Sequence, residues 1–413
     1  MSDACGANHG RRTPVVAEPS AARAGHRRLV LAVTVGAALA IAVLSAPAST
    51  ASPAAHLRHG SERTCPAVPA HFAACLARVV TDASGKPLAT SGPSGYGPPD
   101  IRAAYGLTSA SGAGATVAIV DAYDDPTAAT DLATYRSQYG LPTCAAGTQP
   151  TSCFRKVNQT GGTTPPRADA GWATEISLDL DMVSATCPDC KILLVEANSA
   201  SFSDLGAAVN YAATQGVSAI SNSYGGSDTA QSSDYDHPGI AVTASTGDSG
   251  YGVESPASYD TVVAVGGTSL HKSGSAYSET AWSGAGSGCS TRNSKPLWQT
   301  SATQCSGKAL ADVSAVADPQ TGVAVYDSTR YQGRSGWQVY GGTSASSPII
   351  ASVYTMAGNL AGYPASYTWG HASGLHDVTS GTNGRCTTTV WCKSGTGWDG
   401  PTGLGTPNGL ASF

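Results

Sequence analysis

The sequence has little charge and no long basic run. Only 12% of its 413 residues are Asp, Glu, Lys or Arg, about half of the roughly 25% that is usual. This share is too low for a charge-rich disordered chain or a long coiled coil. The formal net charge of −5 leaves no polybasic footprint, so we expect no nucleic-acid partner.

Two histidine and cysteine motifs that would define other kinds of site are also missing. None of the nine histidines lies in a His-Gly-Thr-His context, and His237, His371 and His376 are interpreted as surface or packing residues. A serine nucleophile in this chain would therefore lack its usual histidine base. No second C-x-x-C accompanies the one at Cys187 and Cys190, so a structural disulfide is favoured there over a zinc or redox site.

The first 48 residues have the pattern of an export signal. Arg27 and Arg28 precede an apolar run over residues 29–44, and an Ala-Pro-Ala cleavage site follows at residues 46–48. The run is shorter than the ~20 residues that span a bilayer, so a cleaved leader is favoured over an uncleaved membrane anchor. No later run is long and apolar enough to span. We therefore predict a secreted, extracellular protein without stable membrane association.

Ten of the eleven cysteines remain once Cys5 leaves with the leader. They fall into neighbours along the chain, which in an oxidising compartment predicts five local disulfides that staple loops. The expected pairs are Cys65–Cys75, Cys144–Cys153, Cys187–Cys190, Cys289–Cys305 and Cys386–Cys392.

Two regions differ in composition. Residues 49–97 are rich in Ala, Ser, Pro and Gly, and they are predicted to be a short propeptide-like or linker segment with a short helix around residues 71–80. From residue 100 onward, short apolar segments alternate with helical patterns, which indicates an α/β fold with a parallel sheet covered by helices on both faces. The expected strands are residues 115–120, 192–195, 219–221, 240–244, 262–265 and 323–326, and the expected helices are residues 127–139, 172–185, 202–214 and 344–360.

The sharpest chemical signal is the stretch Gly-Gly-Thr-Ser-Ala-Ser-Ser-Pro over residues 341–348. Its glycines deliver Ser344 to the start of a buried apolar helix, and a helix N-terminus favours negative charge that develops nearby. This is a sound position for a nucleophile. The alternative is that Thr343 or Ser344 only caps the helix.

Carboxylates could provide the base that the histidines do not provide. Glu175 and Asp179 are four residues apart in a predicted helix, so they share one face, and two adjacent carboxyls push their pKa values apart. One can then accept a proton while the other orients it. The alternative is a solvated acidic face, to which the neighbouring Asp181 is assigned. Asp248 follows a predicted strand in a glycine-rich stretch, where α/β sites gather, with an Asx turn as the alternative.

Together these motifs resemble the sedolisin family, the serine-carboxyl peptidases with a subtilisin-like fold. The resemblance runs from about residue 97 to the C-terminus and implies a single large catalytic domain over residues 98–413. Several short motifs in the family's order are more specific than any one of them alone. They are Pro98-Pro-Asp-Ile-Arg-Ala-Ala-Tyr105, Val117-Ala-Ile-Val-Asp121, Glu175-x-x-Leu-Asp179, Ser221-Asn-Ser-Tyr-Gly225, Ser245-Thr-Gly-Asp-Ser-Gly250 and Gly342-Thr-Ser344.

The resemblance implies a role for each residue of the site. Ser344 would attack the scissile carbonyl, and Glu175 would act first as general base and then as general acid. Asp179 would orient Glu175, with Asp121 as its supporting partner. Asp248 would hydrogen-bond the oxyanion, and it must be protonated to do so because a carboxylate has no donor.

The resemblance also implies one calcium ion near the C-terminus. Residues 376–381 and 394–399 carry two carboxylates and closely spaced loop carbonyls, which suit a hard, oxygen-seeking cation. The alternative is a glycine-rich turn with two solvated aspartates. The implied ligands are the side chains of Asp377 and Asp399 and the carbonyls of Val378, Gly395 and Gly397.

The leading hypothesis is therefore a secreted, monomeric serine-carboxyl peptidase that acts on protein or peptide substrates at acidic pH. One alternative is a subtilisin-type peptidase that uses Asp121 and a histidine. Another is a catalytically silent, calcium-stabilised binding protein at the cell surface. Sedolisins usually carry a folded propeptide domain, and residues 49–97 are too few to form one readily.

Overall fold

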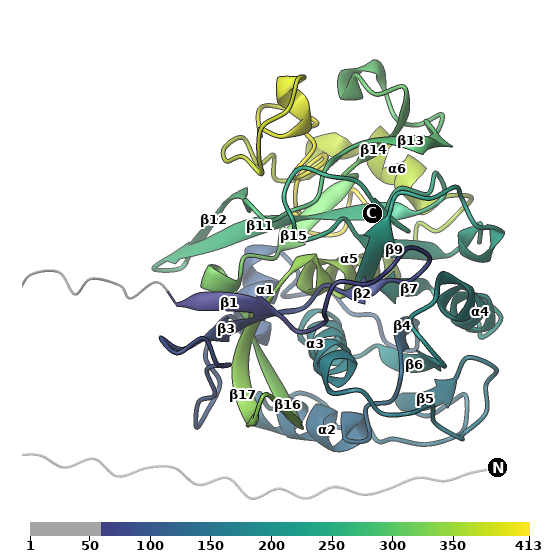
Figure 1. The fold of residues 1–413 in the computed structure, drawn as a ribbon, viewed down its shortest axis with the longest axis vertical. Helices are drawn as coiled ribbons and strands as arrows, with labels where there is room; N and C mark the ends of the chain where they lie inside the picture. Colours follow the sequence, from purple (N-terminus) through teal and green to yellow (C-terminus); the bar gives the residue numbers. More distant parts are fainter. Residues whose placement is uncertain (1–58) are drawn as a thin grey trace, which may run out of the picture. The chain divides into compact units, whose positions relative to one another are not determined.

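An eight-stranded, mostly parallel sheet lies at the centre of residues 59–413, which are the residues that this computed structural model describes (Figure 1). The predicted leader, residues 1–48, lies outside them. The strand order is β12-β11-β9-β7-β4-β6-β5, with β15 also paired to β11, and β12 alone runs antiparallel to its neighbour in this sheet. The strands are β4 (Thr116–Ala122), β5 (Phe154–Asn158), β6 (Lys191–Ala197), β7 (Ala219–Asn222), β9 (Ala241–Ser245), β11 (Val263–Ser273), β12 (Ala276–Ala281) and β15 (Val313–Val316).

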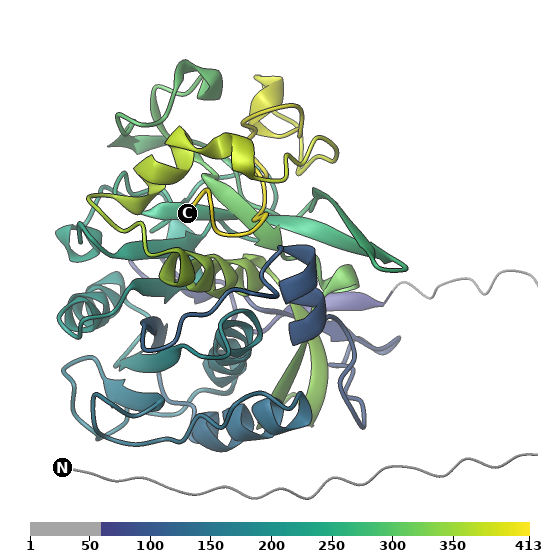
Figure 2. The ribbon, with the colours of Figure 1, turned by 180° about the vertical axis from the view of Figure 1, so that it is seen from behind.

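Helices cover both faces of this sheet, as the sequence predicts. In β4, Val117 and Ile119 belong to one buried cluster with residues of α3 and α5, while Ala118 and Val120 belong to a second cluster with residues of α4. Figure 2 shows the first of these faces, with α5 packed beside α3. The helices are α1 (Pro98–Ala104), α2 (Ala128–Gln138), α3 (Ala170–Thr186), α4 (Phe202–Ala213), α5 (Thr343–Ala357) and α6 (Pro364–Gly370).

Local capping sets where the helices of the site begin. The Asp169 side chain accepts hydrogen bonds from the backbone N–H groups of Gly171 and Trp172, both at 3.1 Å, and so starts α3. Ser201 caps α4 by accepting from the Asp204 N–H at 3.1 Å. Such caps satisfy backbone donors that the first helical turn leaves free.

The prediction of a short helix around residues 71–80 is wrong. This stretch contains two strands, β2 (Ala74–Cys75) and β3 (Arg78–Thr81), which pair with strands far along the chain. Pairing with these partners overrides the local helical pattern, and the β-branched Val79 and Val80 suit the pleated surface. A four-stranded sheet of order β1-β3-β17-β16 results, and β2 joins β8 and β10.

All five predicted disulfides are present, and they include the structural bridge between Cys187 and Cys190. In residues 59–413 no helix has the length and apolar character needed to cross a membrane. The other strands are β1 (Gly60–Arg63), β8 (Tyr224–Ser227), β10 (Glu254–Ser255), β13 (Gly288–Ser294), β14 (Gly307–Leu310), β16 (Val323–Tyr331) and β17 (Arg334–Gly341), and the 3-10 helices are Ser233–Tyr235, Ser301–Thr303, Pro319–Thr321, Ala372–Gly374 and Thr389–Trp391.

Candidate active site

Ser344 lies in the first turn of α5, directly after the turn that joins this helix to β17. Gly342 makes that turn with a φ of 101°, a value that glycine adopts without a steric penalty. The Ser344 side chain is fully buried, and its hydroxyl donates a hydrogen bond to the carbonyl of Ser223 at 3.3 Å. The serine therefore sits at the N-terminus of a buried apolar helix, in the position that the sequence predicts.

Glu175 and Asp179 are fully buried and lie one turn apart on α3. Glu175 Oε2 accepts a hydrogen bond from the Ala77 backbone N–H at 2.7 Å. Asp179 Oδ1 accepts one from the Ser223 hydroxyl at 2.8 Å. Ser223 thus contacts Ser344 through its carbonyl and Asp179 through its hydroxyl, so Asp179 of α3 and the serine of α5 meet at Ser223.

Asp121 completes an acid cluster with Glu175 and Asp179. It lies near the end of β4, is fully buried, and neither of its carboxyl oxygens has a hydrogen-bond partner among the described residues. Burial raises the pKa of Asp121 to about 8. Burial, and then the charge of Asp121, hold the pKa of Glu175 and of Asp179 well above their usual values. Buried, mutually repelling carboxyls retain protons at a pH where exposed carboxyls are charged.

The Ser344 hydroxyl also affects the pKa of Glu175. Although it donates to the Ser223 carbonyl, it lies close enough to Glu175 for hydrogen bonding to lower the pKa of that carboxyl, against the larger effect of burial. Glu175 Oε1 has no hydrogen-bond partner of its own among the described residues. A small rotation of the Ser344 hydroxyl would therefore let it donate a hydrogen bond to Glu175 Oε1.

Asp248 faces the start of α5 from the loop that follows β9. Its Oδ1 accepts hydrogen bonds from the Thr343 N–H at 2.8 Å and from the Thr343 hydroxyl at 2.9 Å. Its Oδ2 is buried and has no hydrogen-bond partner within residues 59–413. Burial raises the pKa of Asp248 to about 6, although the bonds from Thr343 and the charges of Arg78 and Arg63 lower it. In acid this side chain is a neutral donor held beside the Ser344 turn.

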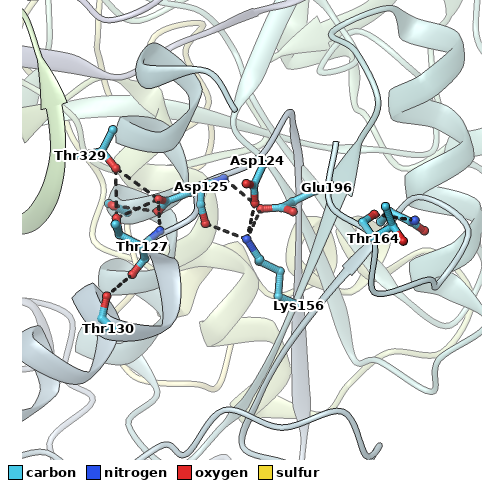
Figure 3. A network of polar contacts seen from close by, with 10 residues as sticks. Asp124, Asp125, Thr127, Thr130, Lys156, Thr164, Glu196 and Thr329 are labelled. Atoms are coloured by element: carbon cyan, nitrogen blue, oxygen red, sulfur yellow. Dashed lines mark hydrogen bonds and ion pairs between the residues drawn. The ribbon is translucent and has the colours of Figure 1, made fainter. Parts of the chain in front are cut away.

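A second acidic network lies past the end of β4 and differs from the acid cluster in having a cation (Figure 3). Lys156 Nζ pairs with Asp124 and, at 3.2 Å, with Glu196, and it donates to the Asp125 carbonyl at 2.8 Å. Glu196 Oε1 also accepts from the Asp125 N–H at 3.1 Å. This network fixes the loop between β4 and α2. Within residues 59–413, no ion pair joins a lysine or arginine to the acid cluster.

The raised pKa values predict that the protein is more stable in acid than at neutral pH. A carboxyl whose pKa is higher in the folded than in the unfolded chain binds its proton more tightly when folded, so its contribution is greatest below about pH 4. That contribution falls as the pH rises towards the folded values, which are about 8 for Asp121, about 7 for Asp327 and about 6 for Asp248.

We expect the Tm, measured by scanning calorimetry, to fall by several degrees between about pH 4 and pH 8, since each pKa unit corresponds to about 1.4 kcal/mol. Asp121→Asn should flatten the upper part of this slope, because asparagine does not titrate. A Tm that rises over the same range would contradict the assignment of raised pKa values.

The predicted calcium ligands lie in two segments, residues 377–378 and 395–399, which a hydrogen bond joins. Asp377 Oδ2 accepts from the Gly397 N–H at 2.9 Å, and Asp399 Oδ2 accepts from the Gly395 N–H at 3.2 Å. No group of three or more His, Cys, Asp or Glu side chains suited to a metal occurs among residues 59–413. A cation here would therefore need the loop carbonyls as well, and two carboxylates with three carbonyls are a donor set that fits calcium.

The histidines that the structure describes make their printed contacts away from the serine. His237 contacts the Asp234 carbonyl, and the His371 ring stacks on Tyr367. Within residues 59–413, no hydrogen bond joins Ser344 to a histidine. This geometry gives no support to a base of the subtilisin type.

Sequence reasoning missed two contributors to the site. Ser223 joins Ser344 to Asp179, and Thr343 fixes the orientation of Asp248. Both lie inside motifs that the sequence analysis singles out, residues 221–225 and 342–344. Their side-chain roles depend on partners 44 and 95 residues away in the chain, so the motifs alone did not reveal them.

Comparisons with known proteins identify relatives among the peptidases. The subtilase family profile matches residues 143–381. Kumamolisin of Bacillus sp. (strain MN-32) is 30% identical over 368 residues, which are 78% of this chain and 63% of kumamolisin. Sedolisin of Pseudomonas sp. (strain 101) is 37% identical over 176 residues, which are 38% of this chain and 29% of that protein. The chain thus spans less than two thirds of the length of these relatives.

A solved structure agrees with the fold as well. The structure of Pseudomonas sedolisin, a serine-carboxyl proteinase complexed with two molecules of pseudo-iodotyrostatin, superposes with a TM-score of 0.64 at 26% identity. The superposition covers 76% of this chain and 96% of the sedolisin chain. The subtilisin-like arrangement of sheet and helices is therefore shared.

Proposed function

Because the chain belongs to the subtilase family and, within it, to the sedolisins, we propose that it is a secreted serine-carboxyl peptidase that hydrolyses protein or peptide substrates at acidic pH. The observation that carries the proposal is that Ser344 and Asp179 meet at Ser223 with Glu175 beside the Ser344 hydroxyl, all fully buried, while no histidine within residues 59–413 is hydrogen-bonded to Ser344. Five disulfides support secretion, because such bonds persist in oxidising compartments.

In the proposed mechanism, the Ser344 hydroxyl attacks the scissile carbonyl while Glu175 takes its proton. Glu175 then protonates the leaving amine, and Asp179 shares the proton network of Glu175 from one helical turn away. Protonated Asp248 donates through Oδ2 to the oxyanion, and its orientation is fixed by the two bonds from Thr343. The helix N-terminus of α5 also favours the negative charge.

Activity should be confined to acid, because the mechanism needs Asp248 with its proton and Glu175 free to accept one. Asp248 must hold a proton, and its pKa of about 6 limits activity above that value. A protein substrate digested between about pH 3 and pH 9, with products sized by mass spectrometry, tests this expectation. We expect cleavage in acid and its loss towards neutral pH.

Serine variants of the protein, tested in the same digest, separate the alternative functions. Ser344→Ala should abolish cleavage. Ser346→Ala is a matched control, because Ser346 is a buried serine of the same helix whose hydroxyl donates to the Ala315 and Val316 carbonyls, so activity should persist. Maximal cleavage above pH 8 would favour a histidine-dependent peptidase. Absence of cleavage at every pH would favour the silent binding protein.

The proposal includes one calcium ion held by the loop oxygens around Asp377 and Asp399. The ion would supply charge neutralisation to a glycine-rich loop and would link residues 377–378 to residues 395–399. It would have no part in bond cleavage.

Chelation should therefore lower the Tm. A ligand present at about 100 times its Kd stabilises a folded protein by about 2.7 kcal/mol, and EDTA removes that contribution. Calcium should restore the Tm, and magnesium should not, because it demands a smaller octahedral site. Asp377→Asn should show a much smaller response to EDTA. A Tm that is unchanged by EDTA in the unaltered protein would rule out the site.

A further inference from the structure

Asn383 is a buried side chain to which the proposed mechanism gives no role. It lies in the chain after the segment of Asp377, and 4% of its surface is exposed. Its amide nitrogen donates to the Ala285 carbonyl at 2.6 Å and to the Ser287 hydroxyl at 2.7 Å. Both amide hydrogens are thereby used, and the orientation of the side chain is fixed, because a carbonyl can only accept.

The backbone of Asn383 binds a different partner, the loop of residues 247–252, which we call the Asp248 loop. The Asn383 carbonyl accepts a hydrogen bond from the Tyr251 N–H at 3.0 Å. A Cβ atom added to Gly250 would lie 2.5 Å from the same oxygen. Gly250 also has a φ of 78°, a value that glycine adopts without a steric penalty. Glycine at position 250 therefore permits this close approach.

The loop of residues 284–287, which Asn383 holds through its side chain, is itself bound to the Asp248 loop. Backbone hydrogen bonds join the two loops both before and after Asp248 in the chain. They run from Gly286 to Gly247, from Gly250 to Gly284, and in both directions between Gly252 and Ser287, with lengths of 2.8 to 3.0 Å. Asn383 thus holds the Asp248 loop directly through its carbonyl and indirectly through its amide.

A disulfide-closed loop supports Asn383 from behind. The Asn383 N–H donates to the Cys392 carbonyl at 3.0 Å, and the Thr382 hydroxyl donates to the same oxygen at 2.7 Å. Cys392 is joined to Cys386 by a disulfide. Asn383 is therefore fixed at its N–H, its carbonyl and its side chain, which makes it a rigid support rather than part of a free loop.

The position of this backbone matters because of what Asp248 is proposed to do. Within residues 59–413 its carboxyl accepts hydrogen bonds only from Thr343, both at Oδ1. These bonds orient the carboxyl, but the distance from Oδ2 to a developing oxyanion also depends on where the backbone of the Asp248 loop lies. A misplacement of about 1 Å can cost about 100-fold in rate.

We propose that Asn383 is a positioning residue for peptide hydrolysis, which holds the Asp248 loop so that Asp248 Oδ2 meets the oxyanion. This inference rests on the proposed function and adds to it a residue outside the acid cluster and the α5 turn. Asn383 acts through Asp248 alone: among the described residues its hydrogen bonds reach neither Ser344 nor Glu175.

A double-mutant cycle between Asn383 and Asp248 tests the inference, with kcat for peptide hydrolysis in acid as the measurement. Asn383→Ala alone should lower kcat by about tenfold or more. In the Asp248→Ala background the same change should lower kcat by less than about twofold, because the donor that Asn383 positions is already gone. Losses that multiply in the double variant, or an unchanged kcat in Asn383→Ala alone, would overturn the inference.

Asn293→Ala is the matched control. Asn293 is also a buried asparagine, and its amide nitrogen donates to the Thr229 carbonyl and to the hydroxyls of Ser258 and Ser290. In the part of the chain that the structure describes, none of these bonds reaches the Asp248 loop. Asn293→Ala should therefore keep kcat within a few-fold, provided that calorimetry shows it to be folded. An equal loss in Asn293→Ala and Asn383→Ala would overturn the inference.

The pH profile gives a second readout that a merely structural role would not move. Burial raises the pKa of Asp248 to about 6, and a loosened loop would admit water to this carboxyl. The alkaline limb of kcat should then move to lower pH in Asn383→Ala and stay in place in Asn293→Ala. None of the charged groups that face Asp248 is altered in either variant; they are Arg78, Arg63, Glu254 and Glu175. An unmoved limb in Asn383→Ala would count against the inference.

A second variant keeps the test decisive if Asn383→Ala does not fold. Ser287→Ala removes the acceptor of one Asn383 side-chain bond and leaves the backbone bonds in place, so it takes the place of Asn383→Ala in the same cycle. Hydrolysis by the unaltered protein together with multiplying losses would overturn the inference and leave the proposed function standing. No hydrolysis by the unaltered protein at any pH would overturn both.

Discussion

Replacing Glu175 with glutamine is expected to lower kcat for peptide hydrolysis by roughly 10³–10⁴-fold, the range that general acid–base catalysis supplies. Glutamine has nearly the same shape, and its carbonyl can still accept the hydrogen bond that Ala77 N–H donates to Glu175. It cannot take the proton of Ser344 at any pH. The loss should therefore appear in kcat across the whole acid range, with little change in KM, because glutamine keeps the shape of the side chain.

A second glutamate provides the control. Glu279 lies on β12, is half-buried, and accepts hydrogen bonds from Thr268, Thr406 and Tyr105. Its side chain has no contact with Ser344, so Glu279→Gln should retain activity within a few-fold if it folds, which its Tm reports. Equal losses in the two variants would show that Glu175 is needed for folding rather than for proton transfer, and near-normal turnover by Glu175→Gln would exclude it as the base.

The sheet and its helices were predictable because local pattern and tertiary environment agree there. Buried parallel strands read as short apolar runs, and β4, β6 and β9 all fall within about two residues of their predicted bounds. Helices α3 and α5 are buried over nearly their whole length, so their apolar content was a strong signal. The disulfides were predictable because every pair closes a short loop.

The N-terminal segment could not be predicted because its structure depends on distant partners. Residues 71–80 contain alanines and a leucine that suit a helix, yet Ala74 pairs with Gly225 and Ala77 binds Glu175, 98 residues away. Propensity is a weak prior against such pairing. The bridging role of Ser223 was hidden for the same reason: a serine in a strand carries no local sign of which helix its hydroxyl will meet.

Replacing Asp248 with alanine is expected to lower kcat by roughly 10²–10³-fold, the usual cost of removing one oxyanion donor. Asp248→Asn should retain much more activity. Its side-chain oxygen can accept both bonds from Thr343, as Asp248 Oδ1 does. That arrangement turns the amide NH2 towards the place of Oδ2, where the aspartate needs a proton to act as a donor.

The pH profile distinguishes a donor from a merely structural carboxyl. Burial raises the pKa of Asp248 to about 6, so in the unaltered enzyme the donor is lost as the pH rises through that value. An amide keeps its hydrogens at every pH, so the alkaline limb of kcat in Asp248→Asn should move upward, to the point where the acid cluster becomes limiting. If Asp248→Asn and Asp248→Ala lost activity equally and kept the original limb, the donor role would be wrong, because a group other than Asp248 would then set that limb. Peptide hydrolysis measured at several pH values for the three proteins decides between these outcomes.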